Sequence, residues 1–84
     1  MSDEQLRTTV LKALREVAPE VTADELEPDA PLQEQIDLDS VDFLNFMIGL
    51  GEQTGIEIPE RDYQEVSTLN GCVAYLAAHG ARVA

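Results

Sequence analysis

Residues 37–55 read DLDSVDFLNFMIGLGEQTG, and this stretch contains a complete helix signal. Asp39 is a preferred N-cap residue, and Asp42 follows at the third helical position, where a carboxylate favours the positive end of the helix dipole. Gly55 suits the position just after the last turn, because glycine adopts the left-handed conformation without strain. The stretch therefore predicts a helix over residues 40–54.

This helix carries more apolar side chains than one face can hold. One stripe at helical spacing would face a core, and it comprises Phe43, Phe46, Met47, Leu50 and Thr54. A second stripe comprises Val41, Leu44 and Ile48. A helix that is apolar nearly all round is either central in a bundle or keeps one face for a partner, and the pattern alone leaves both readings open.

Before this stretch, the chain predicts one long helix and one long connection. Ser2 and Gln5, three residues apart, form a capping box for a helix over residues 3–17. Residues 19–38 then form a connection with three prolines, in which a second capping-box pattern at residues 22–25 favours one helical turn. Spaced apolar side chains would pin the connection to the core, so we expect it to be ordered; they are Leu26, Leu32, Ile36 and Leu38.

After this stretch, the chain predicts a short helix that begins at Pro59 and a last helix over residues 69–79, capped by Thr68 and ended by Gly80. The sequence therefore predicts an all-α fold, a small four-helix bundle of three main helices and one short helix, with the long loop between the first two main helices. A chain of 84 residues makes one domain, with an expected ordered core over residues 2–79 and a short tail over residues 80–84.

Charge and composition exclude several classes of function. Five basic and 17 acidic residues give a net charge of −12, which disfavours nucleic acid and anionic membranes and suits a basic partner surface. The acidic N-terminus is no signal peptide, and no apolar run approaches the ~20 residues of a membrane span, so we expect a cytoplasmic protein. One Cys and one His make neither an internal disulfide nor a zinc site, and the spacing of the acids at residues 37–48 fails the pattern of a calcium loop.

Ser40 is the sharpest candidate site. As the first residue of the predicted helix, its side chain would lie on the surface beside free backbone N–H groups, where a phosphate is stabilised. It is poorly placed to be a catalytic nucleophile, because the only histidine, His79, is far along the chain and no Lys or Arg is near in sequence. On spacing alone, a plain helix start is the favoured interpretation of residues 39–40.

The chain resembles the acyl carrier proteins. DSVD at residues 39–42 is similar to the family's Asp-Ser-Leu attachment motif, with Val in place of Leu. GIEIP at residues 55–59 resembles the family's Gly/Asp-x-Glu-Ile-Pro stretch, at the usual distance from the serine. Residues 68–76 resemble its last helix, so the resemblance covers residues 2–79.

The resemblance implies a monomeric carrier and not an enzyme. A separate phosphopantetheinyl transferase would attach 4′-phosphopantetheine from coenzyme A to Ser40, and the thiol of that arm would hold acyl groups as thioesters for fatty-acid, lipid or specialised biosynthesis. Asp39 would help place the metal of the transferase. The resemblance implies docking of acyl-loading and acyl-using enzymes with basic surfaces on Val41, Asp42, Leu44 and Ile48. It implies an acyl cleft lined by Phe46, Leu50, Ile58 and Cys72.

Departures from the family pattern favour a specialised carrier that serves one pathway. The family commonly has carboxylates where this chain has Asn45 and Gly51, a small or polar residue at Phe43, and an apolar one at Thr54. Gly49 and Gly51 lie within the helix, where they loosen it or allow a close approach. Two other readings are a D-alanyl or aminoacyl carrier and an unmodified helical module that binds a partner helix. A peptidyl carrier is disfavoured, because residues 36–38 read IDL where that subtype has Leu-Gly-Gly.

Overall fold

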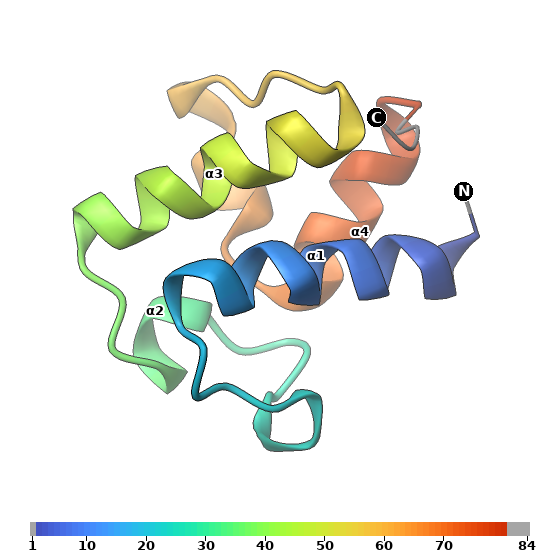
Figure 1. Cartoon of the computed structure of the whole chain (residues 1–84). Coiled ribbons are helices and arrows are strands. Elements are labelled where there is room, and N and C mark those ends of the chain that lie inside the picture. The colour runs from blue at the N-terminus through green and yellow to red at the C-terminus, as the bar shows by residue number, and fades with distance from the viewer. Residues whose placement is uncertain (1, 81–84) are drawn as a thin grey trace.

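A computed structural model describes residues 2–80, and their secondary structure is helical, without strands (Figure 1). The predicted all-α class and bundle are confirmed. In chain order the elements are α1 (Asp3–Val17), the 3₁₀ helix η1 (Ala23–Glu25), α2 (Leu32–Gln35), α3 (Ser40–Thr54), the 3₁₀ helix η2 (Glu60–Val66) and α4 (Leu69–Ala78). The predicted tail lies outside the described residues from position 81 on.

α1 begins with the predicted capping box. The Gln5 N–H donates to Ser2 Oγ at 3.2 Å, and Gln5 Oε1 accepts the Ser2 N–H at 2.9 Å. After the last turn, the Ala18 N–H donates to the carbonyl of Leu14. One face of the helix is almost completely removed from solvent through Leu6, Val10, Ala13 and Leu14.

α3 has the predicted bounds and both predicted caps. Asp39 Oδ1 accepts the Asp42 N–H at 2.8 Å, and Gly55 adopts a φ of 74° while its N–H donates to the carbonyl of Gly51. The predicted core stripe is buried along its whole length. α1 packs against both α3 and α4, so these three helices enclose the core (Figure 1).

The connection between α1 and α3 is ordered, as expected, but its local structure differs from the prediction. A helical turn is present at η1, yet the predicted capping box is wrong, because the Glu25 N–H donates to the carbonyl of Thr22 and not to its hydroxyl. α2 was not predicted. It forms around Leu32, which is fully buried.

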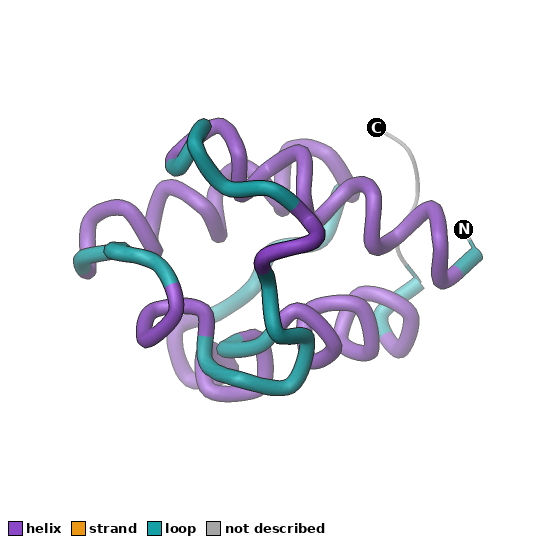
Figure 2. Tube along the Cα trace, turned by 90° about the horizontal axis from the view of Figure 1, so that it is seen from below, coloured by secondary structure: helices purple, strands orange, loops and turns teal. Residues whose placement is uncertain are grey.

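Hydrogen bonds to distant segments hold this connection in place. The Leu32 N–H donates to the carbonyl of Ser67 at 2.8 Å, and the Asn70 N–H donates to the carbonyl of Pro28 at 3.0 Å. The side chain of Asn70 also donates to Asp29 Oδ1 at 2.7 Å and accepts from Arg7 at 3.3 Å. The connection therefore lies across one side of the bundle, the side that faces the viewer in Figure 2.

The short helix predicted from Pro59 is present as the 3₁₀ helix η2, and Pro59 is its N-cap residue. The Asp62 N–H donates to the carbonyl of Pro59 at 2.9 Å, three residues earlier, which is the 3₁₀ pattern. α4 follows with the predicted cap, in which Thr68 Oγ1 accepts the Gly71 N–H at 2.9 Å, and it ends one residue before His79. No helix within residues 2–80 has the length and apolar character needed to cross a membrane.

Candidate functional site

Ser40 is exposed and is the first residue of α3, as the sequence predicts. The first hydrogen bond of the helix joins the Phe43 N–H to the carbonyl of Asp39 at 3.0 Å, and the Asp42 N–H is taken by the Asp39 carboxylate. The N–H groups of Ser40 and Val41 precede these bonds, so the helix itself offers them no acceptor. They lie at the positive end of a helix of 15 residues, an arrangement that stabilises a phosphate group.

A groove of about 450 Å³ opens beside Ser40, between α2, α3 and η2. Its apolar walls come from Phe43, Leu44 and Tyr63. Polar side chains lie between them, and these are Gln33, Glu60, Gln64 and Ser67. The groove therefore offers hydrogen-bonding groups and apolar surface to a molecule attached at the start of α3.

A second groove of about 440 Å³ lies further along α3, where the helix faces the segment that follows it. Met47, Ile48, Ile56 and Ile58 give it apolar walls, and Tyr63 lines it as well as the first groove. The sequence does not single out Tyr63, because it lies 20 residues from Phe43 and only the fold brings the two rings together beside the site.

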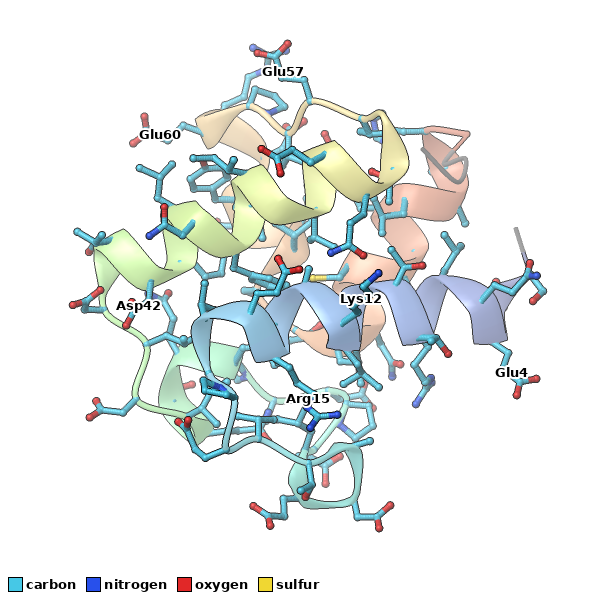
Figure 3. All side chains as sticks on the ribbon, viewed as in Figure 1. Glu4, Lys12, Arg15, Asp42, Glu57 and Glu60 are labelled. Carbon is cyan, nitrogen blue, oxygen red and sulfur yellow. The ribbon has the colours of Figure 1, made fainter. Side chains whose placement is uncertain are left out.

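The second apolar stripe of α3 lies on the surface. Val41 is 63% exposed, Leu44 46% and Ile48 51%, so the structure favours a face kept for a partner over a crowded core helix. Asp42 is half-buried at the start of the same helix. Figure 3 shows Asp42 at the first turn of α3 and Glu60 projecting from the upper left edge of the molecule.

The four cleft candidates separate into two groups. Phe46, Leu50 and Cys72 are fully buried in the packed core and line neither groove. Ile58 is 8% exposed and lines the second groove. The structure thus brings only one of the four next to an open surface.

Neither the thiol nor the imidazole is placed for chemistry at Ser40. Burial raises the pKa of the Cys72 thiol to about 12, and the thiol donates to the carbonyl of Val66 at 3.2 Å. His79 stacks on Tyr75 with ring centroids 4.0 Å apart, at the end of the molecule opposite the start of α3 (Figure 1). Within residues 2–80, the site therefore presents the Ser40 hydroxyl without help from the Cys72 thiol or the His79 imidazole.

Comparison with known proteins supports this picture. A family model described as a phosphopantetheine attachment site matches residues 5–76. An acyl carrier protein of Rubrobacter xylanophilus is 28% identical over 76 residues, which cover 87% of this chain and 94% of the relative. An acyl carrier protein of Helicobacter hepaticus is 32% identical over 59 residues, which cover 70% of this chain and 78% of the relative. One of Acidothermus cellulolyticus is 26% identical over 77 residues, which cover 92% of this chain and 90% of the relative.

A helical bundle with such a site is a phosphopantetheine carrier domain. The chain belongs to the acyl carrier protein family and bears 4′-phosphopantetheine as a covalently attached prosthetic group. The residues around Ser40 fit that group, because free helix N–H groups suit its phosphate and the mixed groove suits an arm that alternates amides with methylene groups. When bound, the group supplies the thiol that holds acyl groups as thioesters.

Proposed function

We propose that Ser40 is the attachment residue and that the chain presents acyl thioesters to partner enzymes without catalysing a reaction itself. The observation that carries this proposal is the exposed Ser40 at the first position of α3, inside the DSVD motif and beside a groove. The match to the family over residues 5–76 includes this position.

In the attachment reaction, Ser40 Oγ forms a new bond to the phosphorus that carries pantetheine in coenzyme A. The bond between that phosphorus and the bridging oxygen breaks, 3′,5′-ADP leaves, and the hydroxyl proton passes to a base on the transferase. Asp39 is exposed beside the hydroxyl, where its carboxylate helps to place the metal of the transferase. The same carboxylate caps α3, so it also stabilises the first turn of the helix that carries Ser40.

We propose that partner enzymes dock on the exposed stripe of Val41, Leu44 and Ile48, with Asp42 and the net charge of −12 steering basic surfaces toward it. The stripe begins next to Ser40, so a docked enzyme lies beside the arm. These partners are the transferase and enzymes that load or use acyl groups. We propose that the carrier works in the cytoplasm, where coenzyme A is available to the transferase.

We propose further that the carrier serves one specialised pathway. The departures from the family pattern are structural features here: Phe43 packs on Tyr63, and Thr54 is buried with its hydroxyl bonded to the carbonyl of Leu50 at 2.6 Å. If general fatty-acid enzymes load and elongate on this chain as efficiently as on their own carrier, this part of the proposal is wrong.

The test of attachment is the intact mass of the protein after incubation with coenzyme A, Mg²⁺ and its cognate transferase. We expect a gain of one phosphopantetheine on the native chain and none on Ser40→Ala. Ser67→Ala is the matched control, because this serine lines the same groove but lies outside the motif, and it should gain the full mass. No gain on the native chain, or an equal gain on Ser40→Ala, would refute the assignment.

A further inference from the structure

Three aromatic rings form a continuous row from the groove beside Ser40 into the core. Phe43 meets Tyr63 edge to face, with ring centroids 5.6 Å apart and planes at 71°. Phe43 also meets Phe46 in the same way, at 6.0 Å and 74°. Tyr63 is half-buried, Phe43 is 7% exposed and Phe46 is fully buried, so the row passes from surface to interior.

This row blocks the way from the groove to the core. Phe43 and Tyr63 are both walls of the first groove, one from α3 and one from η2. Behind them lie Phe46, Leu50 and Cys72, which are fully packed and open onto neither groove. A chain that entered the core here would have to separate the two rings and displace close-packed side chains.

The surface offers an alternative path that leaves the core intact. Tyr63 lines both grooves, so the two grooves are neighbours along α3 and meet at this ring. Residues at helical spacing form the α3 wall of this path, from Ser40 through Leu44 and Met47 to Gly51. The path becomes more apolar along the way, since Gln64 and Ser67 lie at its start and Ile56 and Ile58 at its end.

We propose that the Phe43–Tyr63 pair is a specificity-determining barrier that keeps the acyl group out of the core, so that this carrier is built for short acyl groups held in the surface groove beyond Tyr63. The proposal rests on attachment at Ser40. The polar first groove holds the amides of the arm, and the apolar second groove covers a short cargo. The additional methylene groups of a longer chain remain exposed to water, so they gain no stabilisation from burial.

The experiment compares the holo-protein carrying butanoyl or dodecanoyl groups through hydrolysis-resistant amide analogues of the thioester. The readouts are the melting temperature and the backbone amide NMR shifts. In the native protein, we expect the two forms to melt within about 1 °C of each other. Amide shifts should change in the second groove at Gly51 and Ile58 but not in the core at Leu50 and Cys72.

Removing the ring should open the core. In Tyr63→Ala, the dodecanoyl form should melt about 4 °C or more above the butanoyl form, the scale expected when a chain of this size gains buried apolar surface, and the Leu50 and Cys72 amides should shift. Tyr63→Phe is the matched control, because it keeps the ring, and it should behave as the native protein does. If Tyr63→Ala does not fold, Phe43→Leu removes the partner ring while keeping an apolar side chain, and it should give the same result.

Two outcomes would overturn the barrier. One is a native dodecanoyl form that is stabilised and shifts the core amides. The other is a variant without the ring whose two acyl forms remain alike. Failure of the arm to load at Ser40, seen by mass before any acyl form is made, would instead refute the proposed attachment and the barrier with it.

Discussion

Two glycines two residues apart in α3 should respond to alanine in opposite directions. A Cβ at Gly49 would lie 3.6 Å from Glu16 Oε2 and 3.8 Å from Ala13 Cβ, which are ordinary contacts. A Cβ at Gly51 would lie 2.9 Å from the carbonyl oxygen of Ile56, a backbone atom that must then move. Alanine therefore fits at position 49, whereas the glycine at position 51 allows the chain after α3 to turn back closely against the helix.

The magnitudes follow from these distances. Alanine inside a helix is favoured over glycine by about 0.8–1 kcal/mol, so Gly49→Ala should raise the free energy of unfolding by about 1 kcal/mol and the melting temperature by about 4–8 °C. At Gly51 the same preference is offset by steric strain of about 1–3 kcal/mol, so Gly51→Ala should lower the free energy of unfolding by about 1 kcal/mol. The two variants should therefore differ by about 2 kcal/mol.

Thermal and urea unfolding of both variants beside the native protein measure this difference directly. The double variant should fall between the two single variants, because the sites do not share a contact partner. Equal stabilisation by both substitutions would refute the reasoning, since it would mean that the carbonyl of Ile56 does not restrict position 51.

Three further predictions concern single side chains. Burial, and then the hydrogen bond to Asp62, raise the pKa of Tyr75 from 10 to about 12, so the stability that the protonated hydroxyl contributes is complete below pH 10 and is lost as the pH rises to 12. Tyr75→Phe should therefore flatten the fall of the urea midpoint between pH 10 and 12, and an unchanged slope would contradict this prediction. Ile48→Ser on the exposed stripe should leave the melting temperature unchanged while slowing phosphopantetheine transfer, and an unchanged rate would argue against docking there. Thr54→Val removes the hydroxyl bonded to Leu50 and should reduce the free energy of unfolding by about 1 kcal/mol in urea, whereas no loss would show that this bond contributes nothing.

The fold was predictable where the deciding signals are local. Ser2, Asp39, Gly55 and Thr68 each act within one turn of their own helix, and the structure has the corresponding caps. α2 escaped prediction because four residues carry no periodicity, and this turn depends on burial of its first side chain and on a bond to a carbonyl far along the chain.

The site was predictable in part for the same reason. Ser40 stands out from a short motif, and helical spacing identifies the second apolar stripe of α3, whereas only the structure shows that this stripe is exposed. The grooves were not predictable, because their walls come from α2, α3, η2 and the segment between α3 and η2, and form only when these segments pack. The interior position of Leu50 and Cys72 likewise follows from how α3 and α4 meet in the core.

The hydrogen bonds between the connection and α4 also set an order of folding. α1 and α3 carry their own caps and can form from local contacts, whereas Asn70 binds Asp29 across 41 residues of chain. Closing a loop of that length is unfavourable until both ends have a surface to pack on, so we expect the connection to order last. It should therefore be the first segment to exchange its amide hydrogens, and the start of α3, which it leads into, gains its fixed position only once the carboxyl-terminal helix has docked.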